Sequence, residues 1–177
     1  MNDNFLRIQK IQMPVTVWVH PEGIVAGVIF LLPPVPDSPS GEQPWDVLND
    51  PANFLVIKRD DSEGVRFYNK NAIVRLEYEG AMRAPAESGG PPACRLTMMD
   101  GSLIEGECSA VLPVERSRLY DFMNDTTERF LKLYVDGGKM TLINKSYVVS
   151  ISPLDQQAPA VPPGGSHAGE PAGRATR

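Results

Sequence analysis

Two pairs of short polar motifs are the residues of this chain whose types and spacing could form a binding site. Segment 46–50 reads DVLND and matches segment 121–125, DFMND, at an offset of 75 residues. The dipeptide NK at 69–70 recurs at 144–145 with the same offset. Amide, carboxylate and ammonium groups bind polar ligands through hydrogen bonds and charge. We therefore predict a binding role for Asn49, Asp50, Asn69, Lys70, Asn124, Asp125, Asn144 and Lys145.

The same motifs also have a structural interpretation. Asp46 and Asp121 are favourable N-caps for a one-turn helix, and Asn49 and Asn124 can hold a tight turn. The asparagine of each Asn-Lys pair suits a turn between two strands. The binding interpretation requires the two motifs of each copy to meet at one end of a folded module, where ligands usually bind. The sequence leaves both interpretations open.

The other reactive residues form no catalytic or metal-binding pattern. Of the two histidines, His167 falls in a C-terminal segment without a core, and His20 precedes a predicted turn, where a solvated role is expected. Cys94 and Cys108 lie 14 residues apart without a nearby histidine, unlike the close ligand pairs of a zinc site. We predict buried, reduced thiols for this pair, although a disulfide between them is conceivable. We therefore expect no enzymatic activity and no cofactor.

Alternation of apolar and polar residues predicts five short strands in each of two copies. In the first copy they cover 15–19, 24–32, 54–58, 65–68 and 73–78. In the second they cover 94–98, 104–112, 130–135, 140–143 and 147–151. Asp100-Gly101 is a strong hairpin-turn signal between the first two strands of the second copy. The sequence thus predicts a mainly all-β chain.

The repeat sets the expected domain organisation. Gly27 precedes Pro34 by seven residues, as Gly106 precedes Pro113. We predict a first module over 1–79, a linker over 80–92, a second module over 93–154 and a disordered tail over 155–177. Apolar residues spaced by three suggest a short N-terminal helix over 4–11. Each module is expected to close into a small five-stranded barrel, Sm-like or SH3-like, because a flat sheet would leave its edges exposed.

Composition narrows the function classes. The net charge is −5, and no run of Lys and Arg is present, which disfavours a nucleic-acid partner without excluding a local site. The longest apolar run, 24–35, is interrupted by glycine and proline and is shorter than the roughly 20 residues of a membrane helix. With only two cysteines and no apolar leader, we expect a cytoplasmic protein without a membrane partner.

At these residues each copy resembles the Sm-like small barrel. The second copy has Asp100-Gly101, a following Gly106, the box at 121–124 and a two-residue motif before its last strand. Asn-Lys stands where that family usually has Arg-Gly, and the spacing from Gly106 to the box is longer. The resemblance implies five bent strands after a short helix, and single-stranded RNA binding through Asn124, Asn144 and Lys145. Strand-rich modules with an Asp-x-x-Asn box in bacterial proteins are also similar.

These observations favour a non-enzymatic binding or scaffold protein of the bacterial cytoplasm. Its expected partner is another protein, contacted through loop ends or an exposed strand edge of the duplicated barrel. The alternative is an Sm-like RNA-binding protein, which the acidic net charge of −5 makes the less favoured of the two.

Overall fold

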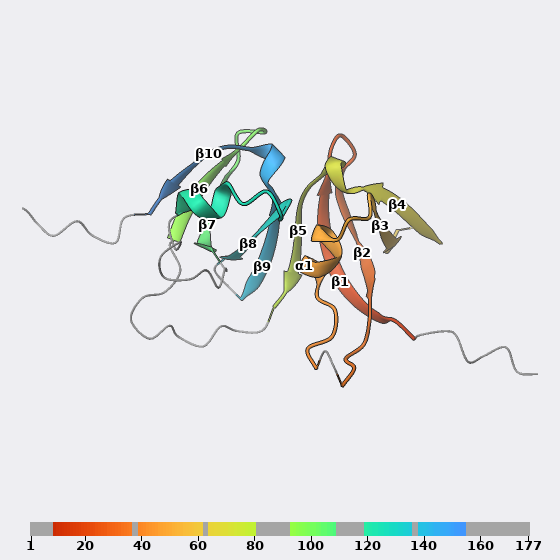
Figure 1. Cartoon of the computed structure of the whole chain (residues 1–177). Coiled ribbons are helices and arrows are strands. Elements are labelled where there is room, and N and C mark those ends of the chain that lie inside the picture. Colours follow the sequence, from red (N-terminus) through yellow and green to blue (C-terminus); the bar gives the residue numbers. More distant parts are fainter. Residues whose placement is uncertain are drawn as a thin grey trace, which may run out of the picture.

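The computed structural model describes residues 9–36, 39–61, 64–80, 93–108, 119–135 and 138–154 (Figure 1). The strands are β1 (Ile11–Val19), β2 (Gly23–Leu31), β3 (Phe54–Arg59), β4 (Val65–Asn69), β5 (Ile73–Glu79), β6 (Ala93–Met98), β7 (Leu103–Cys108), β8 (Phe130–Val135), β9 (Lys139–Asn144) and β10 (Val148–Pro153). Two short helices, α1 (Pro44–Asn49) and α2 (Leu119–Met123), and 3-10 turns at Lys70–Ala72 and Lys145–Tyr147 complete the description. The predicted all-β class is confirmed.

All ten strands form one antiparallel sheet in the order β10-β6-β7-β8-β9-β5-β1-β2-β3-β4. We call the part that ends with β5 the first half and the part from β6 onward the second half. The first half has the order 5-1-2-3-4, and the second half repeats it as 10-6-7-8-9. Each helix lies between the second and third strands of its half, and each 3-10 turn joins the last two strands. The order of elements therefore repeats in full.

The sheet is not closed, which differs from the predicted pair of closed barrels. The halves instead meet at a junction where β5 pairs with β9, from Arg75 opposite Ile143 to Glu79 opposite Lys139. Figure 1 shows these two strands side by side at the centre of the molecule. Each half thus covers one edge of the other with backbone hydrogen bonds, which removes two of the edges that closure was expected to remove.

Several predicted boundaries differ from the observed ones. The N-terminal helix cannot reach residue 11, because β1 begins at Ile11. Residues 9 and 10 are not helical either, and residues 4–8 lie outside the described residues, as do the tail and, apart from Gly80, the linker. The last part of the predicted strand 104–112 is also outside, since the described part of β7 ends at Cys108. Tyr147 belongs to a 3-10 turn rather than to β10.

The described side chains pack into two apolar cores that meet at the junction. The first core combines residues of β1 to β5 and α1 with Phe130, Met140 and Leu142 of the second half. The second core is built from the second half, with Val74 of β5 packed against it. Because three residues of the second half complete the first core, the two halves form a common packed structure.

A glycine in the second strand of each half marks a close backbone approach. A Cβ atom added at Gly27 would lie 2.3 Å from the carbonyl oxygen of Lys58 in β3. At Gly106 the equivalent distance is 2.5 Å, to the carbonyl oxygen of Tyr134 in β8. Both distances are far shorter than a carbon–oxygen contact allows, so only glycine fits where the second strand crosses the third.

Tyr78 gives the junction a predicted alkaline sensitivity. It is 8% exposed, and burial, with smaller effects from Tyr134 and Asp46, raises its pKa from 10.0 to about 12. The unfolded chain therefore loses this proton first. Protonated Tyr78 contributes fully to the free energy of unfolding below pH 10, and this contribution is lost as the pH rises toward 12, by about 1.4 kcal/mol per pH unit. Urea unfolding at pH 9 and pH 11 should show a smaller alkaline loss for Tyr78→Phe than for the wild type. An equal loss in both proteins would contradict the assignment.

Candidate functional site

Lys70 does not project into solvent, although its Asn-Lys motif was predicted as a binding element. Its side chain is 0% exposed. The Nζ atom donates to the carbonyl oxygen of Val47, to the carboxylate of Asp50 at 2.6 Å and to the carbonyl oxygen of Asp50 at 3.4 Å. These acceptors lie at the C-terminal end of α1, where unsatisfied carbonyls and the helix dipole favour a cation. Lys70 therefore acts as the C-terminal cap of α1.

Lys145 has the corresponding position in the second half. It is partly buried, and its Nζ atom donates to the carbonyl oxygen of Asp125 at 2.8 Å. Burial lowers the pKa of Lys145, while the negative charges of Glu128 and Asp125 oppose that shift. Each lysine thus holds the segment that follows the helix of its own half.

The carboxylates and two of the amides hold tight turns. Asp50 accepts from the backbone nitrogen of Ala52 at 2.7 Å. Asp125 accepts from the backbone nitrogen of Thr127 at 2.9 Å, and hydrogen bonds from that residue lower the pKa of Asp125. The side-chain oxygens of the two asparagines in the Asn-Lys pairs accept from the backbone nitrogen two residues further on, at 2.9 Å and 3.0 Å. These contacts match the structural interpretation of the motifs.

Two of the predicted asparagines connect the halves. Asn49, at the end of α1, accepts from the backbone nitrogen of Phe130 at 2.8 Å and donates to its carbonyl oxygen at 3.4 Å. Asn144 is 1% exposed and donates to the carbonyl oxygen of Ile73 at 2.9 Å. These amides satisfy backbone groups across the junction, so they specify how the halves fit together.

Asn124, which corresponds to Asn49, has a different environment. Its side chain is exposed and donates to the carbonyl oxygen of Tyr120 at 2.8 Å. The two motifs meet within each half, since Lys70 contacts Asp50 and Lys145 contacts Asp125, but most of their polar groups already have partners inside the fold. The eight predicted residues form helix caps, turns and junction contacts, and Asn124 lies on the outside of the second half.

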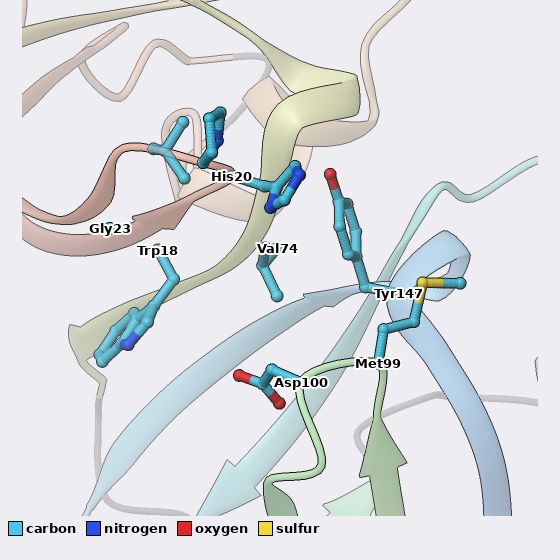
Figure 2. A pocket seen from close by; sticks show the side chains of 9 residues that line it. Trp18, His20, Gly23, Val74, Met99, Asp100 and Tyr147 are labelled. Atoms are coloured by element: carbon cyan, nitrogen blue, oxygen red, sulfur yellow. The ribbon is translucent and has the colours of Figure 1, made fainter.

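A groove lies between the hairpin ends of the two halves (Figure 2). It has a volume of about 380 Å³ and is lined by Trp18, Val19, His20, Pro21, Gly23, Val74, Met99, Asp100 and Tyr147. The His20 and Tyr147 ring centroids are 6.3 Å apart, and Arg75 lies 3.9 Å from the centroid of the Trp18 ring. The walls are mostly apolar, so the groove suits an apolar side chain of a partner. The sequence did not reveal it because the lining residues come from strands and turns that lie far apart in the sequence.

The two cysteines pack in the second core. Both are free and buried, and their sulfur atoms are 3.3 Å apart. Cys94 lies opposite Gly106 in the β6–β7 register, so the cysteines are diagonal neighbours rather than directly opposite. A hydrogen bond between the thiols lowers the pKa of Cys94 and, with burial, raises that of Cys108.

The outer end of the first half carries an apolar patch. Phe54, Val65 and Phe67 are 54%, 47% and 67% exposed. Phe54 pairs with Asn69 and Val56 pairs with Phe67, so the three exposed side chains lie on one face of β3 and β4. This face is opposite to the buried Leu55, which belongs to the first core. We call these three residues the β4 patch.

Within the described ranges, no group of three or more His, Cys, Asp and Glu residues is arranged to hold a metal ion. Among the same residues, no helix has the length and apolar character needed to cross a membrane.

Comparisons with protein-family models, with curated proteins and with solved structures found no match.

Proposed function

We propose that the protein is a non-enzymatic scaffold that acts through protein–protein contacts of its duplicated five-stranded module. The observation that carries this proposal is the edge strand β4, which ends the sheet and bears the apolar β4 patch. Among the described residues, no strand pairs with the outer edge of β4. Edge strands and exposed apolar patches are both typical places for a second polypeptide to bind.

The backbone of β4 is oriented to accept another strand. Lys70 donates its backbone nitrogen to the carbonyl oxygen of Asn53, which directly precedes β3, so every second residue along β4 faces β3. Val65, Phe67 and Asn69 consequently direct their backbone groups outward. Natural sheets often protect such an edge with charged residues or proline, but β4 combines a single charge, Arg66, with two exposed apolar residues.

Binding of single-stranded RNA, the alternative function, has less support. The Lys70 amine is buried, the Lys145 amine donates to a carbonyl oxygen, and the Asn144 amide is committed to the junction. Contact with RNA through these groups would require them to leave their partners. The net charge of −5 also opposes the approach of a polyanion.

A charge placed in the β4 patch tests the proposal. We expect Phe67→Arg to weaken the capture of partner proteins by tagged full-length chain at least about tenfold, because the centre of an apolar interface tolerates a charge poorly. Ile24→Arg is the matched control. Ile24 is 65% exposed, but it lies on β2, which has paired strands on both sides.

Cross-linking followed by quantitative identification of bound proteins provides the measurement, with and without ribonuclease. Proteins lost in Phe67→Arg and retained in Ile24→Arg would support the scaffold function. Capture that is unchanged by Phe67→Arg, or that disappears after ribonuclease treatment, would contradict it.

A further inference from the structure

We infer that the β4 edge of one chain pairs with the outer edge of β10 in a second copy, so that the internal junction is reproduced between chains. This inference rests on the proposed function and names the partner for the same edge. At the internal junction, the fourth strand of the second half, β9, pairs with the fifth strand of the first half, β5. The two ends of the sheet are the fourth strand of the first half, β4, and the fifth strand of the second half, β10. Each end therefore corresponds to one side of the internal junction.

The backbone hydrogen-bonding groups of the two ends correspond to those of the junction. On β9, Met140 and Leu142 face β5, because Lys145 donates its backbone nitrogen to Arg129, directly before the other neighbour, β8. The same pattern on β4 turns Val65 and Phe67 outward. Directly after β10, Leu154 donates its backbone nitrogen to the carbonyl oxygen of Ala93 on β6. The residues between these inward-facing positions, Ile151 and Pro153, therefore face outward.

Transfer of the junction register gives a specific alignment. Leu76 lies opposite Leu142 and Tyr78 opposite Met140 at the internal junction. A shift of 75 residues places Ile151 opposite Phe67 and Pro153 opposite Val65 of the next chain.

The apolar β4 patch matches residues that are buried at the internal junction. Phe130, Met140 and Leu142 are 0%, 3% and 0% exposed because they pack into the core of the first half. Their counterparts by position in the repeat are Phe54, Val65 and Phe67, the three residues of the β4 patch. The β4 patch therefore has the apolar residues that, in the second half, pack into the core of the neighbouring half.

The side of β10 presents the complementary surface. Ile73 and Leu76 are fully buried at the internal junction, whereas their counterparts Val148 and Ile151 are only half-buried. Tyr120 of α2 is 74% exposed, although its counterpart in the first half, Trp45, packs against the first core. A second copy would cover these residues as the second half covers the first.

The polar contacts of the junction also have counterparts at the ends. Asn124 corresponds to Asn49 and would bind the backbone of Phe54 in the next chain, as Asn49 binds Phe130. Asn69 corresponds to Asn144 and would donate to the carbonyl oxygen of Val148, as Asn144 donates to Ile73.

Pro153 makes the interface between chains weaker than the internal junction. Pro153 corresponds to Tyr78 in the repeat, but proline has no backbone N–H, so one hydrogen bond between the paired strands is lost. We therefore expect reversible, concentration-dependent association. The pairing is head-to-tail, and it produces a ring if the rotation between copies closes and a filament if it does not.

Complementation between two variants of the full-length chain tests the inference. Phe67→Arg damages the β4 edge and Ile151→Arg damages the β10 edge, so each variant alone should be monomeric by analytical ultracentrifugation. An equimolar mixture should form a 1:1 dimer, because one intact edge of each kind remains. Wild type should form larger species as its concentration rises, and Pro153→Val should lower the concentration required at least about threefold, since it restores an N–H group.

Circular dichroism and thermal unfolding establish that each variant is folded. Ile151 packs against the second core, so Tyr120→Arg, at an exposed position, is the second variant for the β10 side. Cross-linking tests the register. Arg66→Cys in one chain should form a disulfide with Ser152→Cys in another, because the alignment places them directly opposite, and not with Ile151→Cys.

The outcomes separate this inference from the proposed function. A wild type that remains monomeric at all concentrations overturns the inference, as does an Ile151→Arg variant that still dimerises, which would indicate symmetric β4–β4 pairing. If the chain is monomeric but Phe67→Arg still loses captured partner proteins, the scaffold function remains and only self-pairing fails. If neither effect is seen, both proposals fail.

Discussion

Gly27→Ala is expected to lower the free energy of unfolding by about 3 kcal/mol. The added methyl carbon would lie 2.3 Å from the carbonyl oxygen of Lys58. That oxygen belongs to the backbone of β3, so relief requires β2 and β3 to separate. Their register contains only the pairs Gly27 with Arg59 and Val28 with Lys58, and separation would break it.

Chemical denaturation of the purified variants measures this effect. Gly106→Ala should cost a similar amount, because its Cβ would meet the backbone of Tyr134 at 2.5 Å. Gly80→Ala is the control. Its close neighbour is the side chain of Met140 rather than a backbone atom, so a change in the Met140 side chain can relieve part of the overlap, and a smaller loss than at Gly27 is expected. Equal effects at Gly27 and Gly80 would show that the strands do not cross as closely as described.

Lys70→Met is expected to destabilise the protein by about 2–4 kcal/mol. Methionine retains most of the volume but removes the charged donor that satisfies Val47 and Asp50 at the end of α1. The buried carbonyl oxygens would then have no donor, which costs more than the hydrogen bonds contributed. The Asp50 side chain is 40% exposed, so water can hydrate its carboxylate and limit the loss.

Lys145→Met is the matched comparison, because Lys145 has the same place in the repeat but is only partly buried. We expect a loss of about 1 kcal/mol, measured by urea unfolding of both variants under the same conditions. A Lys70→Met variant as stable as wild type would show that the amine is solvated and free to meet a ligand, which would return the Asn-Lys motif to the binding interpretation.

The strands were predictable because alternation with a period of two is a local property. The segment Phe130–Val135 matches its prediction at both ends, and the Asp100-Gly101 turn joins β6 and β7 as expected. The predicted N-terminal helix is wrong at its C-terminal end. That prediction relied on three apolar residues spaced by three. Val15, Val17 and Val19 instead alternate with less buried residues in β1, and this strand begins at Ile11.

The junction was not predictable from local patterns. Met140 and Leu142 have the same alternation whether β9 closes its own module or pairs with β5, so the sequence could not separate a barrel from an open sheet. Lys70 was assigned to a surface turn because lysine is almost never fully buried. Its burial depends on acceptors that the fold brings from α1.

The shared first core has a consequence for synthesis on the ribosome. The chain emerges from its N-terminus, yet the first core includes Phe130, Met140 and Leu142. At roughly 5–20 residues per second, translation needs about 3–13 seconds to proceed from the end of β5 to Leu142. During that interval the nascent first half exposes the apolar side of β5 as well as the β4 patch. We therefore expect ribosome-associated chaperones to engage this stretch co-translationally, and premature stops before residue 130 to yield aggregates rather than a stable half-molecule.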